Sequence, residues 1–310
     1  TIQTKGWELA IDYRHTFKNG LHFGVTASVA DDKTEVTKWT YNTKIPSYGA
    51  TGWWDKSAYK EGMVLGDIWG LQFDRFLTED DFNADGSLKA GLPDQTKVFP
   101  AGYQFAPGDV LYKDLDNNGE IVKQTNTNDK GDLSVIGNAL PRLQFGLNLD
   151  AAWKGFDISM FFQGVAKRKL WAAGNQVLPG FTTGEPFYKG AEDYWTPENT
   201  DAFYPRPMDY KQSASGNYSV NDRYLLNMAY LRLKTFTVGY SLPKVWLSKF
   251  KVQGLRVYFT GENLFTIDGV KPAIDPEIGI RTASGKSDQR NFGRSYPYQK
   301  TVSFGIQLSL

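Results

Sequence analysis

The chain has 310 residues, with 35 lysines and arginines against 34 aspartates and glutamates, no cysteine, and only two histidines, His15 and His22. The balanced charge argues against a general nucleic-acid binder, which would carry a basic excess on one face. Without cysteine the chain has no disulfides, thiolate metal sites or cysteine nucleophiles, and two histidines supply little for a histidine-rich metal centre.

Two alternating segments near the start predict a β-hairpin. Residues 5–17 place Trp7, Leu9 and further apolar side chains on one face, and residues 21–38 repeat the pattern. The turn between them contains Asn19-Gly20, and Asn-Gly between two alternating runs is the strongest short-range hairpin signal.

Five further long strands follow, so that seven are predicted in all. Their expected ranges are 142–154, 156–171, 224–241, 252–266 and 298–310. Within 224–241 the apolar phase slips by one residue, which predicts a β-bulge near Thr235.

The lengths of these strands and of their connections favour a membrane β-barrel. Strands of soluble sandwiches run about 5–6 residues, whereas a tilted bilayer-spanning strand needs about 9–11. Short connections at 18–20, 155 and 242–251 alternate strictly with long ones at about 39–141, 172–223 and 267–297. Outer-membrane barrels show this alternation, with short periplasmic turns and long extracellular loops. We therefore expect an all-β, antiparallel transmembrane β-barrel segment whose C-terminus is periplasmic.

Several short motifs follow one another over nearly the whole chain. In chain order they are KGWE (5–8), GDVLYKDLDNNGEI (108–121), IGNALP (136–141), YWTPEN (194–199), YPR (204–206), YLRLK (230–234), GYSLP (239–243), LRVY (255–258), GENLF (261–265), DPE (275–277) and YP (296–297). In their order and spacing they resemble the C-terminal barrel region of SusC/RagA-type TonB-linked outer-membrane transporters of the Bacteroidetes kind.

This resemblance implies a larger barrel of the 22-stranded, plugged class, closed by strands outside this chain. Residues 1–310 would be its C-terminal portion, with the plug, the TonB-contacting segment and the signal peptide upstream. The family imports glycans or peptides with a SusD-like surface lipoprotein and is energised by TonB–ExbB–ExbD. It implies an outer-membrane protein in contact with lipid, and neither an enzyme nor a nucleic-acid partner.

One loop motif has the front half of a calcium-binding loop. Asp114, Asp116 and Asn118 offer alternate oxygen ligands, and Gly119 allows a sharp turn, a pattern that suits a hard cation. The back half of the motif is missing, although Asp129, Asp132 or Asn128 could substitute. The alternative is a turn capped by its own Asp and Asn side chains. No cofactor is required, and Ca²⁺ is the candidate ion.

The candidate cargo contacts are loop aromatics and polar side chains of the strands. Flat aromatic rings in the loops could stack on sugars or could instead pack the loops themselves: Trp53, Trp54, Tyr194 and Trp195. Alternation also predicts a lumen-facing set: Arg142, Gln144, Asn148, Asp150, Arg232, Lys234 and Arg256. The paired acids of the loops, Glu192-Asp193 and Glu79-Asp80-Asp81, are interpreted as solvated faces rather than glycosidase carboxylates.

Two alternatives remain open from the sequence. One is a TonB-dependent receptor of another class, which takes up a metal chelate or cobalamin. The other is a secreted carbohydrate-binding or carbohydrate-active β-protein, which would stay soluble without detergent.

Overall fold

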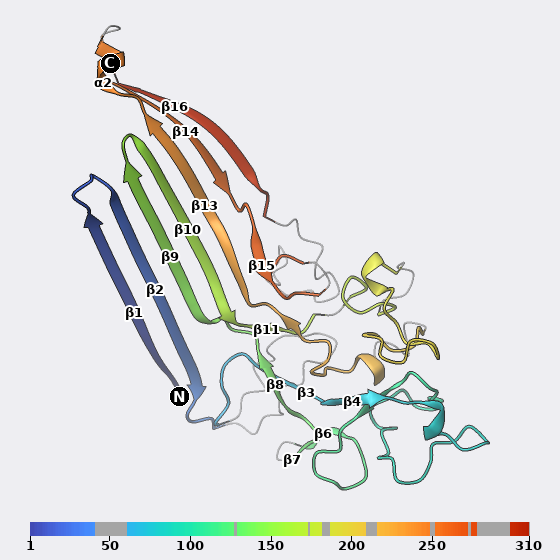
Figure 1. Cartoon of the computed structure of the whole chain (residues 1–310). Coiled ribbons are helices and arrows are strands. Elements are labelled where there is room, and N and C mark those ends of the chain that lie inside the picture. Colours follow the sequence, from blue (N-terminus) through green and yellow to red (C-terminus); the bar gives the residue numbers. More distant parts are fainter. Residues whose placement is uncertain are drawn as a thin grey trace.

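Seven long strands form one antiparallel sheet in the computed structural model, which describes residues 1–40, 61–126, 129–172, 174–181, 187–208, 216–248, 252–271, 274–277 and 298–309. Each strand pairs with its neighbour in chain order (Figure 1). The strands are β1 (Ile2–Thr16), β2 (His22–Val36), β9 (Arg142–Trp153), β10 (Phe156–Lys167), β13 (Tyr230–Ser241), β14 (Gly254–Glu262) and β16 (Thr301–Ser309). The predicted all-β, antiparallel class and its seven long strands are confirmed. No helix among the described residues is long and apolar enough to cross a membrane.

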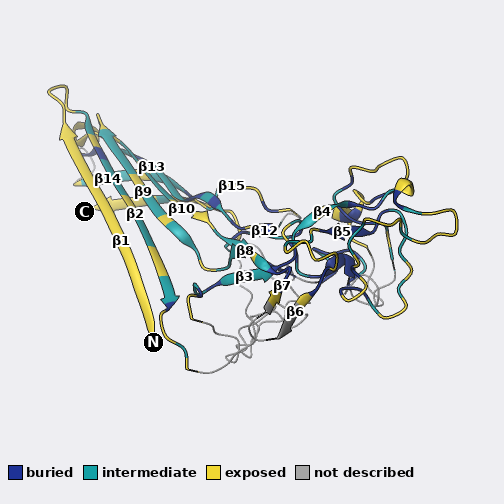
Figure 2. Ribbon diagram, turned by 90° about the horizontal axis from the view of Figure 1, so that it is seen from below, coloured by how far each residue is buried: buried dark blue, intermediate teal, exposed yellow. Residues whose placement is uncertain are grey.

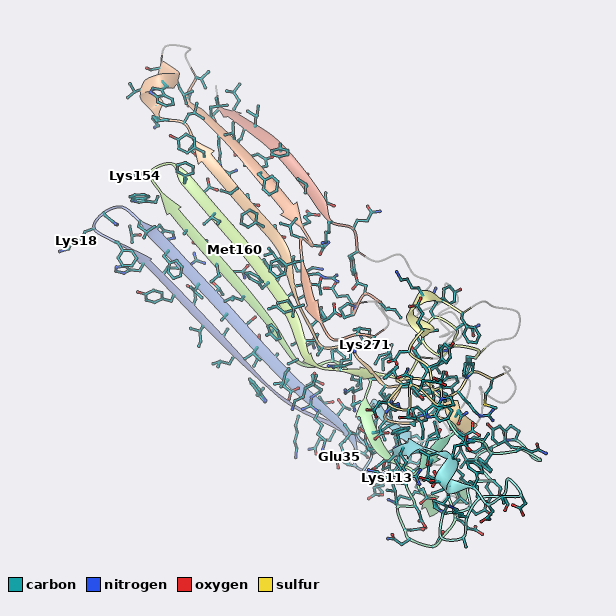
Figure 3. All side chains as sticks on the ribbon, turned by 45° about the vertical axis from the view of Figure 1, so that its right-hand side comes forward. Lys18, Glu35, Lys113, Lys154, Met160 and Lys271 are labelled. Carbon is teal, nitrogen blue, oxygen red and sulfur yellow. The ribbon has the colours of Figure 1, made fainter. Side chains whose placement is uncertain are left out.

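The connections divide the sheet into a turn end and a loop end. The short connections, at 17–21, 154–155 and 242–253, lie at the turn end, where Lys18 and Lys154 are found (Figure 3). The last of them contains the single-turn helix α2 (Lys244–Leu247). The three long connections all emerge at the opposite, loop end (Figure 1). The alternation of short and long connections predicted from the sequence is thus present in the fold.

The first turn forms as the sequence predicts. Gly20 adopts a left-handed φ of 81°, and Asn19 Oδ1 accepts a hydrogen bond of 3.1 Å from the backbone N–H of Leu21. A side-chain amide that replaces a backbone partner in this way stabilises a tight turn.

A β-bulge interrupts β13 close to the predicted position. Phe161 pairs with Thr235, but the next residue, Phe162, pairs with Leu233, so that Lys234 is the extra residue. The bulge keeps Leu233 and Phe236 on one face despite their odd spacing. The predicted strand 224–241 starts later than expected, at Tyr230, after the two-residue strand β12 (Leu226–Asn227).

The predicted strand 252–266 also divides in two. Strand β14 ends at Glu262, Asn263 takes a left-handed φ of 51°, and β15 (Thr266–Asp268) then pairs with Tyr230–Arg232 on β13. The backbone N–H of Asn263 donates to the carbonyl oxygen of Lys234. The break in one strand therefore lies opposite the bulge in the other.

The register sorts side chains onto an apolar and a polar face, because directly paired residues share a face. One row is entirely apolar from β2 to β16 and continues on β1 with His15: Phe23, Ala151, Ile158, Val238, Phe259 and Phe304. The neighbouring row is polar apart from its glycine: Gly24, Asp150, Ser159, Thr237, Thr260 and Ser303. The apolar face is open, with Phe304 82% and Ile306 73% exposed.

The long connections fold into a body of their own beside the loop end. Its short pairs are β3 (Asp67–Gly70) with β8 (Ser134–Asn138), β4 (Phe73–Phe76) with β5 (Val110–Tyr112), β6 (Lys123–Asn126) with β7 (Asp129–Gly131), and β11 (Lys169–Leu170) with β12. Single 3₁₀ turns lie at Glu79–Asp81, Lys189–Ala191 and Gly216–Tyr218. Two buried clusters, around Trp171, Leu178 and Tyr224 and around Leu71, Tyr112 and Trp195, supply its cores, and buried residues gather there rather than in the sheet (Figure 2).

Candidate functional site

The polar face of the sheet carries most of the predicted lumen-facing residues. Gln144 and Asn148 are exposed on β9. Asp150 lies over Gly24, whose missing side chain leaves room for the carboxylate, and its Oδ2 is 3.4 Å from Nε2 of His22. These three residues of β9 form a hydrophilic track on one side of the sheet.

Arg256 crosses a neighbouring strand to reach its partner. From β14 its Nε and Nη2 donate to the carboxylate of Asp157 on β10, at 2.9 and 2.5 Å. The guanidinium passes over Gly239 of β13, where a Cβ would lie 2.4 Å from Nη2. A Cβ at position 239 would displace the end of this side chain, so the glycine leaves room for the crossing, and Arg256 is paired rather than free.

Arg142 lies in a different place from the other predicted lumen-facing residues. Its guanidinium binds the carboxylate of Asp31, and Asp31 lies opposite Trp7 in the register of β1 and β2, on the side of the apolar residues. Leu143 has a left-handed φ of 53°, and its backbone N–H also donates to Asp31. A backbone irregularity at the start of β9 thus places this pair outside the regular polar rows.

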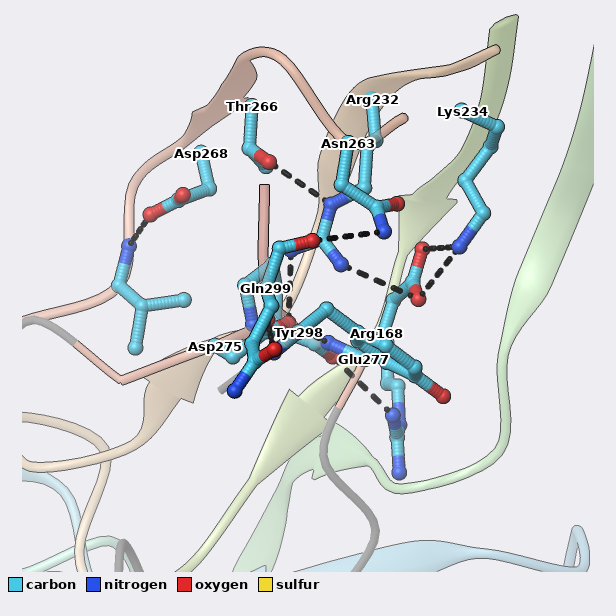
Figure 4. Close-up of polar contacts among 12 residues, drawn as sticks. Arg168, Arg232, Lys234, Asn263, Thr266, Asp268, Asp275, Glu277, Tyr298 and Gln299 are labelled. Atoms are coloured by element: carbon cyan, nitrogen blue, oxygen red, sulfur yellow. Dashed lines mark hydrogen bonds and ion pairs between the residues drawn. The ribbon is translucent and has the colours of Figure 1, made fainter. Parts of the chain in front are cut away.

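Arg232 and the bulge residue Lys234 bind the segment 274–277 (Figure 4). Arg232 donates to Asp275 at 2.8 Å and lies 3.2 Å from Glu277, and Lys234 donates to both oxygens of Glu277 at 3.0 and 3.2 Å. The side chains of Arg232 and Asp275 are only 4% and 5% exposed. We call these four residues the Asp-Glu clasp.

Further contacts fix the geometry of the clasp. Arg232 Nε donates to Thr266 of β15 at 2.7 Å, and Arg168 donates to the carbonyl of Pro276 at 3.5 Å. Burial alone would raise the pKa of Asp275, but hydrogen bonds from Arg232 and from the backbone N–H groups of Glu277 and Tyr298 lower it below its usual value. The clasp joins the last long connection to the polar face of β13.

The acidic partners in these contacts were missed from the sequence. Asp275 and Glu277 are separated from Arg232 and Lys234 by more than forty residues, and Asp157 lies two strands from Arg256. The only sequence signal was the Asp-Pro-Glu motif itself, which carries two carboxylates in a segment of otherwise irregular pattern.

The two adjacent loop aromatics have different environments. Trp195 is 7% exposed and packs against Gly108, Leu71 and the rest of its core cluster. Tyr194 is 41% exposed and lines a cavity of about 400 Å³ together with other aromatic and proline residues: Phe187, Tyr188, Tyr204, Tyr218, Pro179, Pro205 and Pro207. Trp53 and Trp54 lie outside the described residues. Of the described pair, Tyr194 offers an accessible ring.

A buried carboxylate joins two of the long connections. Asp109 is fully buried and accepts hydrogen bonds from Tyr103, Arg206 and Asn217 at 2.8, 2.8 and 2.9 Å. Burial, together with the charge of Asp109, raises the pKa of Tyr103 well above 10. Because every partner bonds the same carboxylate, this network holds the loop body together.

The predicted cation loop brings three carboxylates together. Oxygen atoms of Asp114, Asp116 and Asp132 lie within 4.8 Å of one another. Asn118 Oδ1 instead accepts the backbone N–H of Glu120 at 2.8 Å. Asp132 also accepts backbone hydrogen bonds from Leu115 and Val122. The carboxylate chemistry suits a hard cation such as Ca²⁺, and the same oxygens also cap the turn.

No family model matches the chain. Among curated proteins, the TonB-dependent receptors P26 and P3 of Formosa agariphila are 32% and 26% identical over 100% and 99% of the chain. The TonB-dependent receptor SusC of Bacteroides thetaiotaomicron is 25% identical over 75% of it. The resemblance to SusC/RagA-type TonB-dependent receptors is confirmed. The chain spans only 28%, 29% and 22% of the lengths of P3, P26 and SusC.

Solved structures agree on the fold. The RagAB peptide transporter matches 99% of the chain with a TM-score of 0.66 at 19% identity, and the chain covers 29% of that protein. The RagAB peptide importer in its open-open state gives a TM-score of 0.65 at 18% identity. These relatives are receptors and transporters rather than enzymes, and TonB-dependent receptors are outer-membrane β-barrels.

Proposed function

We propose that this chain forms part of the wall and loops of a TonB-energised outer-membrane importer of oligosaccharides or peptides. The observation that carries the proposal is the seven-stranded antiparallel meander, with an open apolar face and all its long connections at one end. That arrangement suits a wall with lipid on one side and cargo on the other. The match to SusC and RagAB over most of the chain supports the cargo classes.

The proposed orientation places the loop end outside the cell and the turn end in the periplasm. A SusD-like lipoprotein would then meet the loop body. The exposed rings of Phe187, Tyr188 and Tyr194 around the 400 Å³ cavity offer a surface on which such a partner or a sugar ring could stack. Gln144, Asn148 and Asp150 would line the path below.

The test uses the full-length receptor with an affinity tag in its native host. We expect a surface lipoprotein to co-purify in about equal amounts, and uptake of a labelled glycan or peptide to stop when TonB is deleted. A metal-chelate or cobalamin receptor would instead purify without a lipoprotein and would restore growth on iron chelates or cobalamin. Partition of the receptor into the aqueous phase after lysis would contradict both importers and favour a secreted β-protein.

We also propose that Asp114, Asp116 and Asp132 bind Ca²⁺, as the proximity of their oxygens supports. Calcium should then raise the melting temperature of the full-length receptor, and Asp116→Asn should remove that increase. Asp85→Asn, in another exposed loop turn, is the matched control. An equal response to calcium in both variants would mean that these oxygens only cap the turn.

A further inference from the structure

A second, smaller cavity lies where the loop body meets the sheet. Its volume is about 130 Å³, and its walls are partly apolar: Val177, Phe203, Leu225, Leu226 and Gly269. Its polar lining consists of Arg223, Tyr224, Asn227 and Lys271. Lys271 lies at the junction between sheet and loops (Figure 3). A water molecule occupies about 30 Å³ in the liquid, so the cavity admits one small chemical group.

The two cations of this cavity have no carboxylate partner within the described ranges. Arg223 donates through Nε and Nη2 to the backbone carbonyls of Phe203 and Ala202, at 2.9 and 2.7 Å. The carboxylate of the adjacent Asp222 accepts the backbone N–H of Phe73 instead. Asp268, near Lys271 in the chain, accepts the backbone N–H of Val270. The cavity therefore carries positive charge that the surrounding acids do not neutralise.

Arg223 is held rigidly. Its guanidinium carbon lies 4.2, 5.0 and 5.5 Å from the ring centroids of Phe73, Phe76 and Phe203. Stacking on aromatic rings and bonds to two carbonyls fix the planar group, which leaves Nη1 for a further acceptor. A fixed guanidinium loses little entropy when it binds an anion.

Tyr224 adds a buried donor to the same cavity. It is 2% exposed, and its hydroxyl has no hydrogen-bond partner in the structure. Burial raises its pKa well above 10, with the nearby Arg223 acting in the opposite direction. Buried polar groups normally have partners. A buried hydroxyl without one, beside two cations that have no carboxylate partner in the described ranges, therefore indicates a missing acceptor.

We propose that this cavity binds one carboxylate group of the imported cargo, an inference that rests on the proposed transport function. Arg223 and Lys271 supply the charge, and the Tyr224 hydroxyl donates to one carboxylate oxygen. The carboxylate can come from a uronic acid of a glycan or from the end of a peptide.

The test measures binding to the full-length receptor in detergent by calorimetry, with probes that differ only in charge. Trigalacturonate is compared with its methyl ester, and N-acetyl-trialanine with N-acetyl-trialanine amide. We expect at least one acid to bind tenfold or more tightly than its neutral counterpart, with an advantage that shrinks as salt is added. The acid that binds identifies the source of the carboxylate. Equal binding of both acids and their neutral counterparts overturns the proposal.

Variants then assign the preference to this cavity. Tyr224→Phe removes only a hydroxyl that has no protein partner, so the fold should persist, and we expect about a tenfold loss of acid affinity with the neutral probes unchanged. Lys271→Gln should lower acid affinity and flatten its salt dependence, whereas Lys113→Gln, an exposed lysine elsewhere in the loop body, should not. Unchanged acid binding in Tyr224→Phe and Lys271→Gln would overturn the site. Binding to the purified receptor does not require TonB. If uptake fails but the preference for acids over their neutral counterparts remains, only the proposed transport function is contradicted.

Discussion

Gly108 shows how one residue determines the packing of a loop core. Its φ is +89°, and a Cβ added there would lie 2.5 Å from the ring of Trp195 and 2.9 Å from Cβ of Arg206. The ring of Trp195 therefore lies directly against the backbone of residue 108. The next residue, Asp109, then bonds Arg206, so that contacts at two adjacent positions join the two long connections here.

Gly108→Ala should destabilise the loop body by about 2–4 kcal/mol, because strain at positive φ adds to overpacking against Trp195. Gly102→Ala is the matched control: its φ is +76°, but no atom lies within 4 Å of the added Cβ. The control variant should be destabilised only by the strain at positive φ, about 1 kcal/mol. Limited proteolysis of the folded receptor measures the difference. Equal protease sensitivity in the two variants would mean that the Trp195 contact is unimportant.

At the scale of the strand, the bulge at Lys234 sets the faces of β13. Removing one residue moves every side chain beyond it to the opposite face. A deletion of Lys234 would turn Arg232 toward the apolar side and Leu233 toward the polar side. We expect little assembled receptor from this deletion, measured as the fraction that shifts on a gel after heating. Lys234→Ala keeps the residue count and should assemble. If it does not, the loss of assembled receptor is caused by the missing ion pair with Glu277 rather than by the change of register.

The clasp makes a pH-dependent contribution that can be isolated. Because the pKa of Asp275 is below its ordinary value of about 3.9, its stabilising contribution is complete above that value and is lost as pH falls through the lower folded pKa. Asp275→Asn removes one of the two carboxylates beside the buried Arg232, with Glu277 still 3.2 Å away, and should cost about 2 kcal/mol at pH 7. The difference in melting temperature between wild type and variant should stay constant down to about pH 5 and shrink below pH 4. A constant difference down to pH 3 would contradict this assignment.

At the scale of the whole molecule, the sheet was predictable and the loop body was not. Strand periodicity is local, so the faces on which Val25, Leu149 and Phe236 lie can be predicted from the few residues around each of them. The partners of Arg232 and Asp109 lie far along irregular segments, where no period relates one residue to the next. For the same reason the sequence could not tell that Trp195 is buried while the adjacent Tyr194 is exposed. Composition signals an aromatic loop, but only tertiary packing decides which ring is accessible.

The proposed membrane wall can be tested with two neighbouring residues of β9. Leu149 pairs with Met160 and Val25 on the apolar face, and Asn148 pairs with Thr26 on the polar face. If lipid covers the apolar face, Leu149→Arg should cost about 2–4 kcal/mol, the penalty for a cation near the bilayer midplane. Asn148→Arg places the same charge one residue away on the hydrated side and should cost less than about 1 kcal/mol. Refolding of both full-length variants into lipid vesicles, followed by denaturant titration, measures the two values. Equal costs for the two variants, or a larger cost for Asn148→Arg, would contradict a lipid-covered apolar face.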